Sequence, residues 1–284
     1  MAIFPDPVPR GPVTANINFS HGPAPGQVAF NYVGEPPAGE PQRNIGMDAH
    51  AVLIHDIRGR ESGFGLDKDA FATITGLAPS AELDFVDDDS IRNNYYPEVE
   101  RLLLDNIPGA NRVFLFDHTI RRADPGAKRA PVYYAHIDQT PVSAPQRVRT
   151  HMGDEADELL KGRFRIVNVW RTLNKNAVEA SPLAFASSAS FGNQDAIPVE
   201  HRYPSGYTGQ TAAIVHNPDQ QWFYWSGMTG SERLLLECFD SEGLKPGSGV
   251  QGGRVPHTAF EDPRTRADAE GRESIEVRAL VFGP

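Results

Sequence analysis

The chain has 284 residues, of which 39% are hydrophobic and 23% charged, so it is long enough to bury a sizeable core and too apolar to be disordered. Its formal net charge of −10, with no run of Lys and Arg, argues against nucleic acid or an anionic membrane surface as a partner. The single cysteine, Cys238, excludes an internal disulfide framework and a cysteine-based zinc site. No apolar run approaches the roughly 20 residues of a membrane span, so we expect a soluble protein of the cytoplasm.

The N-terminal region is distinguished by its content of proline and glycine. Residues 1–45 contain "FPDPVPRGPV", "HGPAPGQ" and "GEPPAGEPQR", with one short strand-like piece, "QVAFNYV". Frequent proline and glycine residues predict an extended arm that lies on the body of the protein, not a separate domain. Residues 46–284 are expected to form a single domain.

Short apolar runs alternate with turn residues through the rest of the chain. This pattern favours a mainly β sandwich or barrel over a parallel α/β sheet. Two helices are expected to flank the strands, at residues 89–106 and 153–161, because both segments open with acidic residues. The expected strands are "HAVLIHDI", "AFATITG", "NRVFLFDHTI", "VYYAHID", "RIVNVWR", "TAAIVHN", "QWFYWSG", "ERLLLECF" and "SIEVRALVF".

The segment "AHIDQT" ends one of these apolar runs and contains a histidine and a carboxylate two positions apart. Residues i and i+2 of a strand point to the same face, so His136 and Asp138 would lie side by side. Such a pair can bind a metal ion. Alternatively, the aspartate can be the hydrogen-bond partner of a buried structural histidine. One His-x-acid match is about what chance supplies in this composition, so the pair alone leaves both alternatives open.

The C-terminal stretch adds three residues that fit the metal-binding alternative. His257 would complete a set of two histidines and one carboxylate, the facial arrangement of non-haem Fe(II) oxygenases. The three positions left open on iron could take two oxygens of 2-oxoglutarate and one dioxygen molecule. Arg272 and Ser274 share one face of the last predicted strand and could hold the far carboxylate of that co-substrate. A surface strand with solvated charges is the alternative.

At these segments the chain resembles a family of fungal and bacterial oxidoreductases, which is grouped with gibberellin desaturase and the cephamycin methoxylation protein. The likeness covers about residues 48 to 283 and lies in "FDHTIRR", "AHIDQT", "GDEADELL", "NVWRTL", "HTAFEDP" and "RESIEVRALVF". It implies a double-stranded β-helix (jelly-roll) oxygenase that uses Fe(II) and 2-oxoglutarate on small molecules of specialised metabolism. The iron ligands map to His136, Asp138 and His257, and the co-substrate anchor to Arg272 and Ser274.

His257 is separated from Asp138 by a longer stretch than many oxygenases of this superfamily have, so His216 is the substitute ligand to consider. Tyr134 shares the strand face of the first histidine and is a candidate for the pocket wall. Arg171 is the reserve binder of the co-substrate anion, and Arg278 is a further possible anchor.

Two other functions compete with the oxygenase. A zinc hydrolase would use the same three ligands with a metal-bound water as nucleophile. A non-catalytic β-sandwich could bind a glycan through exposed aromatic residues such as those of "QQWFYWSG". The prime substrate, the choice between hydroxylation, desaturation and ring formation, and the oligomeric state are not indicated by the sequence.

Overall fold

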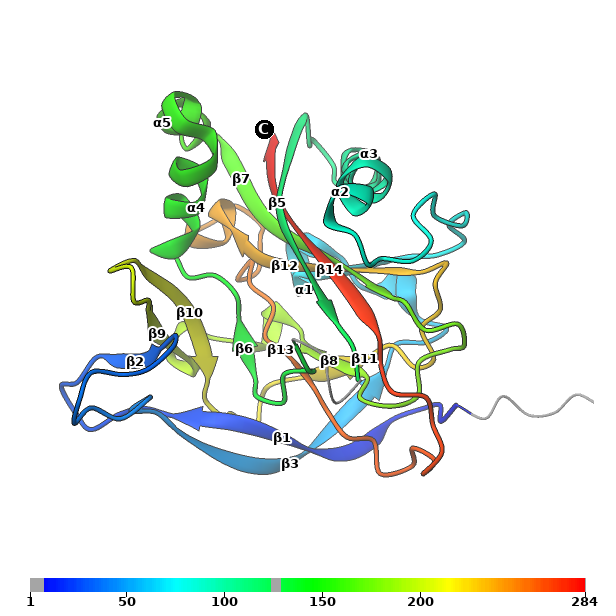
Figure 1. Cartoon of the computed structure of the whole chain (residues 1–284), viewed down its shortest axis with the longest axis horizontal. Helices are drawn as coiled ribbons and strands as arrows, with labels where there is room; N and C mark the ends of the chain where they lie inside the picture. Colours follow the sequence, from blue (N-terminus) through cyan, green and yellow to red (C-terminus); the bar gives the residue numbers. More distant parts are fainter. Residues whose placement is uncertain (1–7, 124–128, 284) are drawn as a thin grey trace, which may run out of the picture.

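Two facing β-sheets account for most of the secondary structure (Figure 1), in a computed structural model that describes residues 8–123 and 129–283. Within those ranges the larger sheet has nine strands, in the spatial order β1 (Val13–His21), β3 (Gly46–Asp56), β11 (Trp222–Tyr224), β8 (Leu183–Ala186), β13 (His257–Ala259), β6 (His136–Ile137), β10 (Thr208–Ile214), β9 (Ala196–Arg202) and β2 (Ala29–Tyr32). The smaller sheet, over the same part of the chain, has five, in the order β4 (Phe71–Ile74), β12 (Arg233–Asp240), β7 (Arg163–Thr172), β14 (Ser274–Gly283) and β5 (Arg112–Arg121). The predicted fold class, mainly β with flanking helices in a double-stranded β-helix, is confirmed.

The helices lie outside the sheets. They are α1 (Leu66–Asp69), α2 (Asp88–Ser90), α3 (Tyr96–Asn106), α4 (Ser143–Met152) and α5 (Ala156–Leu159), and a π-helical turn (Ile91–Tyr95) joins α2 to α3. The helical segment predicted at 89–106 is confirmed. The one predicted at 153–161 is shorter than expected and follows a helix that was not predicted, α4, whose charged and polar residues obscure its apolar stripe.

Strand β14 has two chemically different faces, as its alternation predicts. Ile275 and Val277 belong to the apolar core under α3, together with Val99 and Leu103 of that helix. Ser274 and Glu276 line a cavity on the opposite face of the sheet. The small sheet therefore separates a dry helix–sheet core from a polar interior.

The large sheet curls so that its first strand covers one of its own faces. Ile17 and Phe19 of β1 are buried in one cluster with Ile137 and Trp222, although β1 is hydrogen-bonded only to β3 among the described strands. The Phe19 and Trp222 rings lie edge to face with centroids 5.7 Å apart.

The N-terminal region thus differs from the expected arm with one short strand. Residues 13–21 form β1 and residues 29–32 form β2, at the two edges of the large sheet, while residues 1–7 lie outside the described residues. The alternation in "VTANINFSH" is weak in the sequence because alanine and asparagine occupy three of its nine positions. The expectation of strand-like character near residues 27–33 is confirmed by β2.

The aromatic segment "QQWFYWSG" does not present its rings to solvent. Trp222, Phe223, Tyr224 and Trp225 are each at least 90% buried, in clusters on both faces of the large sheet. The expectation that these residues form an exposed glycan-binding surface is therefore wrong. Strand β11 lies between β3 and β8, where each face is covered by other elements.

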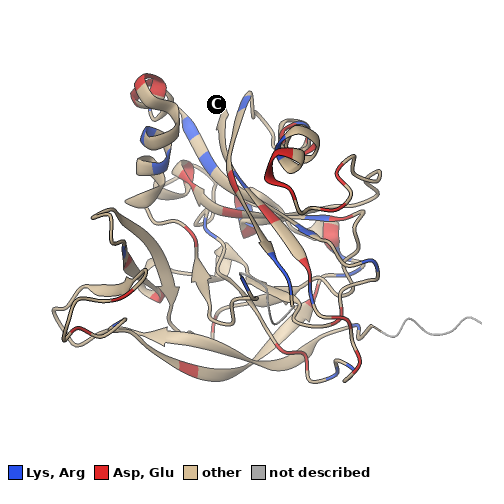
Figure 2. Cartoon of the chain, viewed as in Figure 1, with Lys and Arg blue, Asp and Glu red and all other residues tan. Residues whose placement is uncertain are grey.

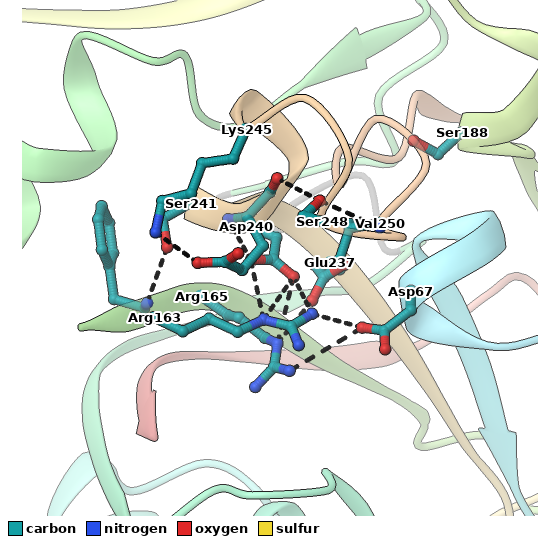
Figure 3. A network of polar contacts seen from close by, with 12 residues as sticks. Asp67, Arg163, Arg165, Ser188, Glu237, Asp240, Ser241, Lys245, Ser248 and Val250 are labelled. Carbon is teal, nitrogen blue, oxygen red and sulfur yellow. Dashed lines mark hydrogen bonds and ion pairs between the residues drawn. The ribbon is translucent and has the colours of Figure 1, made fainter. Parts of the chain in front are cut away.

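A buried ion network joins β7 to β12 (Figure 3). Arg163 donates from Nε to both carboxylate oxygens of Asp240, at 3.2 and 3.1 Å, and also pairs with Asp67. Arg165 Nε lies 3.4 Å from Glu237, which is fully buried and has no hydrogen bond to either side-chain oxygen within the described residues. Burial, followed by the charge of Asp240, raises the pKa of Glu237 well above its ordinary value, although Arg165 opposes the shift.

We expect Glu237→Gln to change how stability depends on pH. A carboxyl group with a raised pKa in the folded state binds its proton more tightly there than in the unfolded state, so the parent loses stability as pH rises above the ordinary glutamate pKa. The variant lacks this loss, and its stability relative to the parent should grow by up to about 1.4 kcal/mol per pH unit. Urea unfolding at pH 4 to 7 measures the difference, with the exposed Glu35→Gln as the matched control. If the free energy of unfolding of the parent instead increased relative to that of the variant as pH rises, Glu237 would act as an anionic partner of Arg165.

Candidate metal centre

Three predicted ligands meet between the sheets although they are far apart in the sequence. His136 on β6 and His257 on β13 are register partners of two antiparallel strands, and Asp138 follows β6 directly. One potential ligand atom from each residue lies within 4.8 Å of the others. The long segment between Asp138 and His257 contains α4 and the strands from β7 to β12. The pairing of β6 with β13 brings the two ligands together in spite of this separation in the sequence.

Both histidines are oriented by main-chain carbonyl groups. His136 Nδ1 lies 2.9 Å from the carbonyl oxygen of Tyr134, and His257 Nδ1 lies 3.2 Å from that of Val255. A carbonyl only accepts, so Nδ1 carries the proton on each ring and Nε2 is left with its lone pair. Each Nε2 is therefore the atom available to a metal ion.

Asp138 is positioned through one of its two oxygens. Its Oδ2 accepts from Asn168 Nδ2 at 2.8 Å and from Arg278 Nε at 3.2 Å, while Oδ1 lies 3.5 Å from His136 Nε2. Burial alone would raise the pKa of Asp138, but Arg278 and the two histidines hold it well below its usual range. The aspartate is therefore an anion with Oδ1 directed at the histidines.

His257 is kept neutral by its surroundings. Its side chain is buried, and this burial is the main reason that its pKa is lowered to about 4. A metal ion binds the neutral imidazole, so no proton has to be displaced from this ring near neutral pH. Two nitrogen donors and one carboxylate oxygen on a single side suit a first-row divalent metal with open positions.

A narrow cavity extends from the three ligands, between β5, β7 and β14 of the small sheet and β6, β8 and β13 of the large sheet. Figure 2 shows charged residues of both signs on β5 and β14, which border it. Besides the ligands, its polar wall consists of Thr119, Arg121, Thr258, Arg272, Ser274, Glu276 and Arg278.

Arg272 is the most deeply buried cation of this wall, at 2% exposure. Its Nη1 donates to the carbonyl oxygen of Ser181 at 2.7 Å, its guanidinium lies 5.7 Å from the centre of the Trp170 ring, and its Nε has no hydrogen-bond partner among the described residues. Burial, followed by the charge of Arg121, lowers the pKa of Arg272 to about 10. Ser274 lines the same cavity two positions later on β14. An uncompensated cation beside a hydroxyl is suited to a carboxylate ligand.

Arg278 has a different role from Arg272, although both line the cavity. Its nitrogens already bind carboxylates, Asp138 through Nε, Asp117 through Nη1 at 3.0 Å and Glu276 through Nη2 at 2.5 Å. Each nitrogen of this guanidinium has a partner and three carboxylates already compensate its charge, so Arg278 is not an uncompensated cation. Arg278 and Asn168 were not predicted as supports of Asp138, although the polar Asn168 inside the apolar run "RIVNVWR" was a signal of such a role.

The remaining sequence candidates do not line this cavity. The Tyr134 ring lies 5.2 Å from that of His136 and lines a second cavity on the other side of this histidine, together with His201. Arg171 points to the opposite face of the small sheet, where its guanidinium is 4.8 Å from the centre of the Phe85 ring. His216 stacks on His50 with ring centres 4.0 Å apart and is not part of the ligand group.

Comparisons with known proteins identify relatives that are named as oxidoreductases. A family model described as an oxidoreductase/YMDC permease-like domain matches residues 17–282. The hydroxylase/desaturase poxK of Penicillium oxalicum is 37% identical, over 97% of this chain and 93% of that protein. The alpha-ketoglutarate-dependent dioxygenase phiK of a fungal species is 31% identical, over 83% of this chain and 84% of that protein. The solved structure of the iron and alpha-ketoglutarate-dependent endoperoxidase NvfI matches with a TM-score of 0.86 and 27% identity, over 97% of this chain and 99% of that one.

The chain belongs to this oxidoreductase family, which confirms the resemblance seen in the sequence motifs. Among the described residues, no helix has both the length and the apolar character that crossing a membrane requires.

Asn168→Leu should weaken binding of a divalent metal about tenfold or more while the fold persists. The change removes one of the two donors that fix Asp138 Oδ2, and loss of such an outer hydrogen bond lowers metal affinity by roughly 10- to 100-fold. Titration with Co(II), followed by its visible absorption, measures the effect. Asn106→Leu on the exposed side of α3 is the matched control. Equal Co(II) affinity in the parent and Asn168→Leu would mean that Arg278 alone positions the aspartate.

Proposed function

We propose that this protein is a non-haem Fe(II)/2-oxoglutarate-dependent dioxygenase that oxidises a small molecule of specialised metabolism by hydroxylation, desaturation or ring formation. One observation carries the proposal: a His-Asp-His group and a buried arginine with an unpartnered Nε border the same cavity. The relatives named as dioxygenases and hydroxylases support it.

The donor set fits iron. In the proposed centre His136 and His257 would hold it through Nε2 and Asp138 through Oδ1, and three protein ligands would leave positions open for 2-oxoglutarate and dioxygen. Iron, when bound, supplies the activation of dioxygen that couples decarboxylation of 2-oxoglutarate to oxidation of a C–H bond.

Arg272 and Ser274 are the proposed anchor of the co-substrate. A carboxylate beside Arg272 would accept from the free Nε and compensate a charge that no side chain pairs with in the described ranges. Arg278 is excluded from this role because three carboxylates already bind its nitrogens, and Arg171 because it lies on the other face of the sheet. The protein thus holds the co-substrate at its two ends, by metal and by arginine.

The second cavity, on the far side of His136, is the proposed approach of the prime substrate. Tyr134, Met47 and Ile45 contribute apolar surface there, while Arg43 and His201 contribute polar groups. Tyr134 is therefore proposed as a wall of the substrate pocket and not as a ligand of the co-substrate.

The zinc hydrolase is less well supported than the oxygenase. It would share the three metal ligands, but a metal-bound water needs no second carboxylate anchor, and the buried pair of Arg272 and Ser274 would have no purpose. A cytoplasmic location is part of the proposal, because the lone Cys238 is buried and suits a reducing compartment.

His136→Ala and Asp138→Ala should each abolish iron retention and turnover without unfolding the protein, because apolar clusters hold the sheets together without the side chains of these two residues. Under nitrogen, adding Fe(II) and 2-oxoglutarate to the parent should produce a weak metal-to-ligand charge-transfer band that both variants lack. His257→Ala should behave in the same way, and His216→Ala is the matched control that keeps the band. A variant with stoichiometric iron and full activity would remove the replaced residue from the metal centre.

Arg272→Leu should weaken 2-oxoglutarate binding by roughly 30-fold to several thousand-fold, because it removes one partner of a buried charge-assisted pair worth about 2–5 kcal/mol. Ser274→Ala should cost about 1 kcal/mol of binding free energy for 2-oxoglutarate. Arg272→Lys should retain little of the affinity, because an ammonium group lacks the planar pair of N–H donors of a guanidinium. The apparent constant for 2-oxoglutarate is measured from the charge-transfer band, and iron binding should stay unchanged.

Arg171→Leu is the control for this series and should bind 2-oxoglutarate like the parent. If Arg272→Leu also binds it like the parent, Arg272 is not the anchor.

A further inference from the structure

A cavity of about 470 Å³ lies on the outer face of the small sheet, between α3 and the loop at residues 77–79. None of its lining residues borders the metal-side cavity. Leu77, Pro79, Pro97, Val99 and Leu102 give it apolar walls. Its volume is in the range of sites for small organic molecules.

Two arginines lie side by side near this cavity, and one of them, Arg233, lines it. Pairing of Leu234 with Trp170 places Arg233 of β12 next to Arg171 of β7, on the face that carries α3. The ring of Tyr95 lies against both guanidinium groups, with its centre 5.4 Å from Arg171 and 5.7 Å from Arg233. Like charges on adjacent strands repel each other, so this arrangement is unfavourable unless an anion is shared between them.

No carboxylate of the described residues forms an ion pair with either arginine. Arg233 is 3% exposed and donates from Nη1 to the carbonyl oxygens of Gly230 and Glu232, both at 2.8 Å. The Nε and Nη1 atoms of Arg171 are buried without a hydrogen-bond partner in the described ranges, and so is the hydroxyl of Tyr95. Burial, followed by the charge of Arg233, lowers the pKa of Arg171. The aromatic contacts and the nearby Tyr95 hydroxyl offset part of this desolvation, but no carboxylate of the described residues forms an ion pair with Arg171.

The nearest acidic side chains are engaged elsewhere. Glu98, which lines the cavity, accepts from Ser80 Oγ at 2.8 Å and from the Ala81 amide at 2.7 Å. Glu232 pairs with Arg58. Asp105 lines the cavity from the exposed side of α3 and forms no ion pair with an arginine of the described chain.

We propose that this cavity binds an organic carboxylate with a short apolar body. The carboxylate would accept from Arg233 and from the Tyr95 hydroxyl, with Arg171 adding positive charge behind the ring, while the apolar body would lie along Pro97, Val99 and Leu102. The apolar walls favour such a molecule over inorganic phosphate. This inference does not depend on the proposed function of the metal centre.

Binding of octanoate to the full-length protein tests the proposal, with octanamide as the uncharged match. Isothermal titration should give saturable binding of octanoate and an affinity for octanamide that is lower by about tenfold or more, since a charge-assisted hydrogen bond is lost. Arg272→Leu should bind octanoate like the parent, which separates this cavity from the metal-side cavity.

Arg233→Met should weaken octanoate binding by about 10- to 100-fold and leave octanamide binding unchanged, because methionine replaces the charge with a chain that packs in the same apolar space. Tyr95→Phe removes only the hydroxyl, and should weaken octanoate binding by several-fold even if Arg233→Met does not fold. Arg101→Met, at the exposed rim of the same cavity, is the matched control and should change affinity by less than about threefold.

Three results would overturn the proposal: no saturable octanoate binding by the parent, equal affinities for octanoate and octanamide, or parent-like octanoate binding in both Arg233→Met and Tyr95→Phe. Each would mean that the arginine pair serves only to pack against Tyr95. Loss of octanoate binding in Arg272→Leu would assign the ligand to the metal-side cavity and would also reject this site.

Discussion

The pairing of β6 with β13 is the contact on which the candidate site depends. It is short, since β6 has two residues and β13 has three, yet it places His136 opposite His257 in the only register that brings both imidazoles beside Asp138. A slip by one residue would turn one histidine to the opposite face of the sheet, where apolar side chains such as Ile137 lie. The flanking strands β8 and β10 are longer and hold this register in place.

The elements with strong periodicity could be predicted from the sequence, and the weakly patterned ones could not. The two faces of β14 follow from its alternation, and the helix ending at Asn106 follows from the acidic residues at the start of its segment. Strand β9 contains Pro198 and β13 has three residues, so neither carries a recognisable local pattern. These strands exist because their neighbours offer hydrogen bonds, which is a property of the assembled sheet.

The site shows the same division between local and non-local information. His136 and Asp138 are two positions apart on one strand, so their proximity could be derived from strand geometry alone. The supports of Asp138 come from β7 and β14 in the opposite sheet, and no spacing in the sequence connects Asn168 with Arg278. The Nδ1 contacts to carbonyl groups depend on local backbone direction, which residue types do not reveal.

The position of β14 has a consequence for how the protein forms during synthesis. Among the described strands it comes last in the sequence, yet it lies between β7 and β5 and not at an edge of the small sheet. Until β14 has been synthesised and has left the ribosome, β7 and β5 have no shared neighbour, and the core under α3 lacks its central strand. A nascent chain that stalls before β14 has emerged would therefore expose two unpaired strand edges to aggregation.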